Sequence, residues 1–75
     1  MRDIKIIDKH NWDFTLYEIE GERIIGVVFF GLVDFSRNFQ LSEEEANLNH
    51  EGLKMLSERI RNDYESYKHR EITIG

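Results

Sequence analysis

The sequence predicts one α+β domain over residues 1–75, in which a small antiparallel β-sheet has one long or kinked helix packed on one face. Two observations lead to this fold class. The first half of the chain alternates apolar and polar residues around a glycine turn, which is typical of a β-hairpin. The second half starts with a helix-capping sequence and continues with apolar residues three and four positions apart. The expected element order is β-β-β-(β)-α-β, with three to five strands in the sheet.

The central element is a hairpin whose turn lies at Glu20-Gly21, where glycine accepts the positive φ of a tight turn. A two-residue turn fixes the register of the flanking strands, residues 12–19 and 22–30. The predicted cross-strand pairs on one face are Leu16 with Ile25, Phe14 with Val27, and Trp12 with Phe29. Because all these side chains are apolar, we expect this face to lie against the helix.

The opposite face of residues 22–30 is apolar as well, which is typical of a central strand. One helix covers one face only, so four side chains are expected to be exposed in a monomer and available for association: Tyr17, Ile24, Val28 and Phe30. The alternative is that residues 32–41 fold back over this face, with Phe35 and Phe39 as a lid.

Three further segments have strand character. The isoleucines of residues 4–7 predict a first strand, followed by a polar turn at residues 9–11. Apolar residues at even spacing within 33–41 predict a fourth strand after a bend at Gly31. Residues 71–74 predict a short final strand.

A capping box marks the start of the helix, because Ser42 stands three residues before Glu45. The apolar stripe that follows consists of Leu53, Leu56, Ile60, Tyr64 and Tyr67. Basic residues at 68–70 complement the negative end of the helix dipole and close it. Packing this stripe on the hairpin predicts a core of Phe14, Leu16, Ile25, Val27, Leu53, Leu56 and Ile60.

The helix is too long for the sheet if it is unbroken. Residues 42–68 would span roughly 40 Å, whereas nine-residue strands cover about 30 Å. Gly52, with the asparagines before it, is the expected place for a kink or for a division into two helices. In an unbroken helix Leu48 and Met55 point away from the core, whereas a break allows Leu48 to turn inward.

The amino-acid composition excludes some classes of function and partner and favours others. The chain has no cysteine, which excludes disulfides, thiolate metal sites and thiol catalysis. A formal net charge of −5 disfavours nucleic acid as a partner and favours a basic protein. Charged residues interrupt the N-terminal segment, and no apolar run approaches membrane-spanning length, so we expect a cytoplasmic protein without membrane contact.

No residue pattern predicts a catalytic, cofactor-binding or metal site. His10, His50 and His69 do not have the spacing of metal ligands, and His10 is expected to be solvated. The acidic residues 43–45 are explained by helix capping, and no glycine-rich phosphate loop is present. We therefore expect no cofactor, and a chain that is not an enzyme by itself.

The sequence favours a small acidic protein-binding module. It acts either by self-association as a homodimer or by inhibiting a basic partner, as an immunity protein inhibits a toxin. Two alternatives remain open: a small enzyme or ligand-binding protein whose site forms only in an oligomer, and an architectural subunit of a larger assembly. The candidate partner-binding residues are Tyr17, Ile24, Val28, Phe30, Leu48 and Met55.

Overall fold

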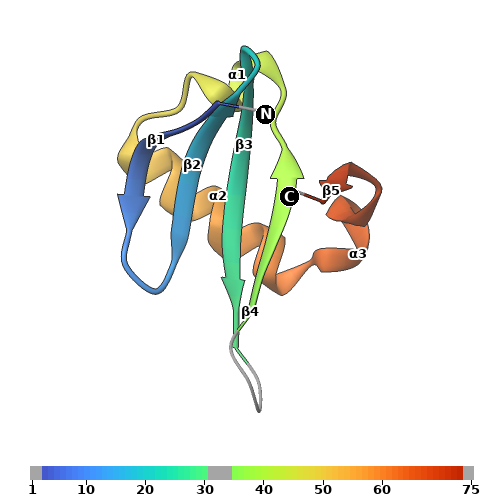
Figure 1. Cartoon of the computed structure of the whole chain (residues 1–75). Helices are drawn as coiled ribbons and strands as arrows, with labels where there is room; N and C mark the ends of the chain where they lie inside the picture. The colour runs from blue at the N-terminus through green and yellow to red at the C-terminus, as the bar shows by residue number, and fades with distance from the viewer. Residues whose placement is uncertain (1–2, 31–34, 74–75) are drawn as a thin grey trace.

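The computed structural model describes residues 3–30 and 35–73 and confirms the α+β fold. One antiparallel sheet has its strands in sequence order: β1 (Ile4–His10), β2 (Phe14–Ile19), β3 (Glu22–Phe29), β4 (Phe35–Gln40) and β5 (Glu71–Ile72). The helical elements follow β4: α1 (Glu43–Ala46), α2 (His50–Asn62), α3 (Tyr64–Tyr67) and the 3₁₀ turn η1 (Lys68–Arg70). In Figure 1, α2 crosses the sheet on one side only.

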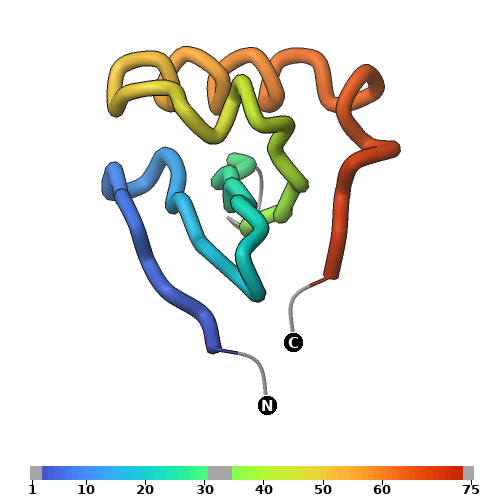
Figure 2. Tube along the Cα trace, turned by 90° about the horizontal axis from the view of Figure 1, so that it is seen from above, coloured from blue at the N-terminus to red at the C-terminus, as the bar shows by residue number. Residues whose placement is uncertain are grey.

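The core lies between α2 and the sheet. The predicted core residues are all buried and belong to one cluster: Phe14, Leu16, Ile25, Val27, Leu53, Leu56 and Ile60. Phe39 and Leu41 of the following segment join this cluster, while Phe29, Tyr64 and Tyr67 pack at its margin. In Figure 2 the helices form one layer, and β1 and β5 curve away from it on either side of the sheet. The other side of the sheet is called the outer face below.

The β2–β3 hairpin has the predicted register, with Leu16 opposite Ile25 and Phe14 opposite Val27. Its turn residues Glu20 and Gly21 have φ values of 52° and 82°. Two successive positive φ angles are typical of the tight turn that matches the twist of a hairpin. The predicted pairing therefore follows from local chain geometry alone.

Trp12 was predicted to continue this pairing opposite Phe29, and that prediction is wrong. β1 extends to His10, so the turn comprises residues 11–13 instead of 9–11 and contains Trp12. The partner of Phe29 is Phe35 of β4. The polar residues 8–10 carried a turn-like composition, but pairing with β2 kept them in the strand.

β4 forms the fourth strand, and its pairing excludes the lid alternative. Phe39 lies opposite Ile25 and is buried in the helix-side core, whereas Phe35 is partly exposed on the same face. The predicted bend at Gly31 and residues 32–34 lie outside the described residues. The final strand is present as β5, which comprises Glu71 and Ile72 and pairs with β4, whereas Thr73 of the predicted range 71–74 lies outside the strand.

The outer face is less open than expected. Ile24 is only 2% exposed, and its neighbours Tyr17 and Val28 are half-buried. A Cβ atom at Gly26 would lie 3.1 Å from the Tyr17 ring and 2.9 Å from the Asn38 side chain. Because Gly26 has no side chain, the Tyr17 ring lies across β3 and covers this face.

The helical segment is divided into several pieces, and the first break precedes Gly52. Asn49 caps α2, and its side-chain oxygen accepts a hydrogen bond from the Gly52 amide at 2.8 Å. Asparagine at a cap competes with helix continuation, so the boundary falls on the asparagines and Gly52 lies in the first turn of α2. Despite the break, Leu48 stays 39% exposed. A second boundary at Asp63 separates α2 from α3.

The predicted capping box is confirmed. The Glu45 amide donates to Ser42 Oγ at 3.2 Å, and the Ser42 amide donates to Glu45 Oε1 at 2.9 Å. Arg70 of η1 also bonds both oxygens of Glu45, at 2.5 and 3.2 Å. Burial alone would raise the pKa of Glu45, but the bonds from Arg70 and Ser42 hold it below its usual value. This box therefore anchors both α1 and the C-terminal segment.

We expect Ser42→Ala to lower the free energy of unfolding by about 1 kcal/mol, because the Glu45 amide loses its acceptor. Urea unfolding followed by circular dichroism measures the effect. Ser66→Ala, an exposed serine of α3, is the matched control and is expected to change stability by less than about 0.5 kcal/mol. Equal stabilities for the two variants would show that the capping bond contributes nothing.

Candidate functional site

Three large apolar side chains are exposed at one end of the sheet, which we call the aromatic end. They are Trp12, Phe30 and Phe35, exposed by 77%, 58% and 46% respectively. Trp12 lies in the β1–β2 turn, Phe30 follows β3, and Phe35 starts β4. These segments share one end of the antiparallel sheet, the lower end in Figure 1. Exposed aromatic groups in such number on a small domain are typical of an interaction surface.

Trp12 has an unusual backbone conformation. Its φ is 67°, in the left-handed region that glycine and asparagine enter readily and bulky residues rarely adopt. Asn11 and Asp13, on either side, are residues common in turns. The chain therefore places its one tryptophan at a position that favours a small residue, and leaves it in contact with water.

Two backbone hydrogen bonds made by Asp13, the residue after Trp12, hold the Trp12 turn in place. The Asp13 amide donates to the His10 carbonyl at 3.0 Å, and the Asp13 carbonyl accepts from the Val28 amide at 2.9 Å. Strained conformations persist where the surroundings over-determine them. The turn is thus hydrogen-bonded to both β1 and β3.

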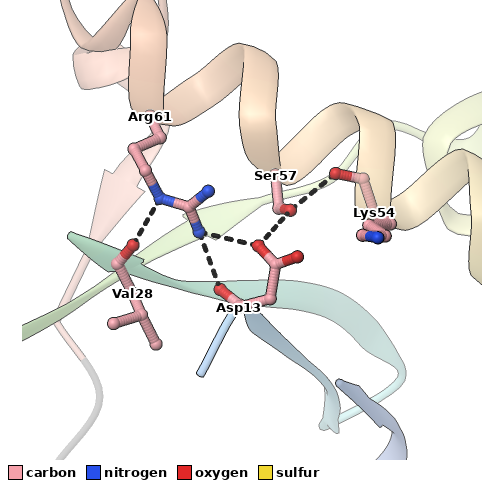
Figure 3. A network of polar contacts seen from close by, with 5 residues as sticks. All are labelled: Asp13, Val28, Lys54, Ser57 and Arg61. Carbon is pink, nitrogen blue, oxygen red and sulfur yellow. Dashed lines mark hydrogen bonds and ion pairs between the residues drawn. The ribbon is translucent and has the colours of Figure 1, made fainter. Parts of the chain in front are cut away.

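Asp13 is also bound to α2 by a partly buried polar network, drawn in Figure 3. The Arg61 guanidinium donates to Asp13 Oδ1 at 2.7 Å, to the Asp13 carbonyl at 3.1 Å and to the Val28 carbonyl at 2.6 Å. The Ser57 hydroxyl lies 3.0 Å from the same carboxylate oxygen and 2.7 Å from the Lys54 carbonyl. Burial alone would raise the pKa of Asp13, but hydrogen bonds from Arg61 and Ser57 hold it below its usual value. Trp12 is thereby presented on a rigid support.

The two other aromatic side chains of this end pack against arginines. The Phe30 ring lies 5.0 Å from the Arg61 guanidinium, so it contacts the helix layer and does not belong to the outer face as predicted. Arg37 lies 5.0 Å from the Phe35 ring and donates to Glu71 at 2.9 Å. Since Asp13 and Glu71 neutralise these arginines, the aromatic end presents an apolar surface and not a basic one.

The remaining predicted residues separate into two places. Leu48 and Met55 line one open groove of about 230 Å³ together with Gly52 and Leu56. Ile24 is buried, and Tyr17 and Val28 are half-buried on the outer face. The structure therefore brings Leu48 and Met55 together but does not join them to the sheet residues. Sequence reasoning missed Trp12 as a site residue, although a tryptophan between two turn-forming residues was a usable signal.

A second polar group lies at the start of α2. The carboxylate of Asp8 lies 2.8 Å from His50 Nδ1, and His50 Nε2 lies 3.2 Å from His10 Nδ1. The hydrogen bond to His50 holds the pKa of Asp8 below its usual value. His10 also stacks on Phe14 with 6.2 Å between ring centroids, so the prediction that it is solvated is wrong. Forty residues separate His10 from His50, and no local spacing reveals their contact.

Residues 3–30 and 35–73 contain no group of three or more potential ligands arranged to hold a metal ion. Within the same residues, no helix has the length and apolar character needed to cross a membrane. No known family model, curated protein or solved structure matches the chain.

Proposed function

We propose that this chain is a protein-binding module that inserts Trp12 into an apolar pocket of its partner. The observation that carries the proposal is the conformation of Trp12, which is 77% exposed while its φ is held at 67°. Glycine or asparagine would adopt this φ at lower cost, and either would leave less apolar surface in water. A function that needs the indole group accounts for both costs.

The support beneath Trp12 favours tight recognition. Tryptophan is enriched among the residues that dominate binding energy at protein interfaces. A side chain on a turn held by Arg61, Ser57 and Val28 loses little backbone freedom when it docks. Phe30 and Phe35 lie at the same end and extend the apolar contact around the indole ring.

The partner we propose is a basic protein. The chain carries a formal charge of −5, and exposed carboxylates lie near the β2–β3 turn and on α1: Glu22, Glu43 and Glu44. Such charge attracts a positively charged partner and raises the association rate, while the apolar contact at the aromatic end supplies affinity. Inhibition of a basic enzyme, in the manner of an immunity protein, would use the acidic charge for attraction and the apolar surface for affinity.

Trp12→Gly tests the proposal, because it removes the indole group and relieves the backbone. We expect the variant to be about 0.5–1 kcal/mol more stable than the wild type, since little buried surface is lost and the positive φ becomes unstrained. We also expect it to lose the partner that the wild-type chain captures from its host, measured by affinity capture with mass spectrometry. The fluorescence of Trp12, the one tryptophan, should shift to shorter wavelength when that partner binds the wild type.

Glu20→Gly is the matched control. Glu20 is the other non-glycine residue with positive φ among the described residues, at 52°, and it lies in the β2–β3 turn. This variant should gain a similar stability and retain the partner. Capture that is equally strong for Trp12→Gly and the wild type would overturn the proposal. Self-association is the remaining possibility, and sedimentation analysis of the wild type and the two variants tests it. A dimer that dissociates only in Trp12→Gly would identify a second copy of the chain as the partner.

A small enzyme is the second candidate function, and the contact between Asp8, His50 and His10 favours it. A carboxylate that orients an imidazole is a common arrangement in general-base catalysis. A substrate site beside these residues would need walls contributed by a second copy of the chain. Activity that appears only with dimer formation and disappears in His10→Gln would support this candidate.

A further inference from the structure

We propose that Asp8, His50 and His10 form a proton-operated latch that fastens the start of α2 to the end of β1 and opens on acidification. The latch is a property of the free chain, so it stands or falls independently of the proposed function. It differs from an ordinary surface ion pair because two imidazole rings contact each other directly, with 3.2 Å between their nitrogens.

A β-bulge at Ile7 builds the latch. Ile6 lies opposite Tyr17 on the outer face, whereas Asp8 lies opposite Leu16 on the helix side. Residues 6, 8 and 10 of a regular strand would all point to one face. The register shift between Ile6 and Asp8 therefore turns Asp8 and His10 toward α2, where His50 is the first residue of the helix.

Hydrogen bonding determines which ring nitrogens carry protons at neutral pH. The Asp8 carboxylate is an acceptor only, so His50 Nδ1 must donate to it. Neutral His50 then has a lone pair on Nε2, which accepts the hydrogen bond from His10 Nδ1. His10 Nε2 is left with a lone pair that one further proton can occupy without breaking either bond.

A second added proton breaks the contact between the rings. When both imidazoles are charged, all four ring nitrogens are donors, and two donors face each other across 3.2 Å. The carboxylates whose charge reaches the rings are Asp8 on β1 and Asp13 in the β1–β2 turn. Asp13 already forms an ion pair with Arg61, and the side chain of Glu51 on α2 is exposed to solvent. Asp8 is therefore the carboxylate that compensates an added charge on the rings. The nearby carboxylate of Asp8 compensates one imidazolium charge and leaves the second uncompensated.

Opening of the latch affects the core and the Trp12 turn. Both rings pack on Phe14, with centroid distances of 6.2 Å for His10 and 5.4 Å for His50, and Phe14 is only 1% exposed. The His10 carbonyl also accepts the hydrogen bond that closes the Trp12 turn. Separation of the rings uncovers this edge of the core and loosens the turn.

Nitrogen-15 NMR of the imidazole rings, together with amide hydrogen exchange between about pH 8 and pH 5, tests the latch. At pH 8 we expect the proton of His10 on Nδ1, the tautomer that a free side chain does not favour. His69 is exposed and serves as the internal reference. On acidification the protection factors of amides 8–14 should fall about fivefold, the change in an equilibrium constant that one ordinary hydrogen bond supports.

His50→Gln is the decisive variant. Its amide group donates to Asp8 and accepts from His10, as neutral His50 does, but it takes up no proton in this pH range. We therefore expect the protection of residues 8–14 to stay constant on acidification in this variant, and to fall in the control His69→Gln as in the wild type. A proton on His10 Nε2 at pH 8 in the wild type, or an equal loss of protection in His50→Gln, would overturn the proposal. The tautomer measurement decides the question if His50→Gln does not fold.

Discussion

Leu56→Ala is expected to lower the free energy of unfolding by about 2–5 kcal/mol. Leu56 is 4% exposed and belongs to the cluster between α2 and the sheet. Truncation removes apolar contacts and leaves a cavity that the surrounding side chains fill only in part. Because a domain of this size has a net stability of roughly 3–5 kcal/mol, a loss of this size removes much or all of that stability at 25 °C. Urea titration at low temperature or in a stabilising osmolyte measures the loss.

Met55→Ala is the matched control for this prediction. Met55 precedes Leu56 on the same helix but is 63% exposed, so its truncation should change stability by less than about 0.5 kcal/mol. A loss in Met55→Ala as large as that in Leu56→Ala would mean that α2 presents a different side to the sheet.

Arg61→Met is expected to cost about 1–3 kcal/mol, because it leaves the partly buried Asp13 carboxylate without its cation. The side chains of Arg61 and Asp13 are 18% and 13% exposed, and the Val28 carbonyl loses its guanidinium donor as well. Thermal and urea unfolding measure the loss. Arg59→Met is the control: Arg59 is an exposed arginine of the same helix, and its replacement should be nearly neutral.

The difference between wild type and Arg61→Met should depend on pH. In the wild type the pKa of Asp13 lies below its usual value of 3.8, because hydrogen bonds from Arg61 and Ser57 outweigh the effect of burial. The stabilisation is therefore complete above pH 3.8 and is lost as the pH falls through the lowered value. The difference between the unfolding free energies of wild type and Arg61→Met should therefore become smaller in acid. A difference that does not depend on pH would mean that the variant is destabilised by lost packing and not by loss of the ion pair.

The elements that the sequence predicted correctly depend on neighbours along the chain. Glu20-Gly21 fixes the hairpin register because a two-residue turn leaves one pairing available. Ser42 and Glu45 start α1 through bonds that span three residues. The stripe through Leu53, Leu56 and Ile60 identifies the buried side of α2 by helical periodicity.

The errors come from features that have no local pattern. The bulge at Ile7 inverts the alternation of β1, so His10 lies against α2 instead of in solvent. The missing side chain at Gly26 admits the Tyr17 ring, which is why the outer face is less exposed than alternation predicts. Trp12 left the predicted strand because β1 pairs with β2 up to His10.

The sequence by itself determined the α+β class, the central hairpin, the helix start and seven residues of the core. These follow from turn geometry, capping and periodicity, which act over a few residues. Tertiary structure alone decided the support beneath Trp12 and the contact between His50 and Asp8, because each joins residues far apart in the chain. Arg61 meets Asp13 across 48 positions, and His50 meets Asp8 across 42. Such contacts depend on where packing places α2 over the sheet, and no spacing of residue types encodes that placement.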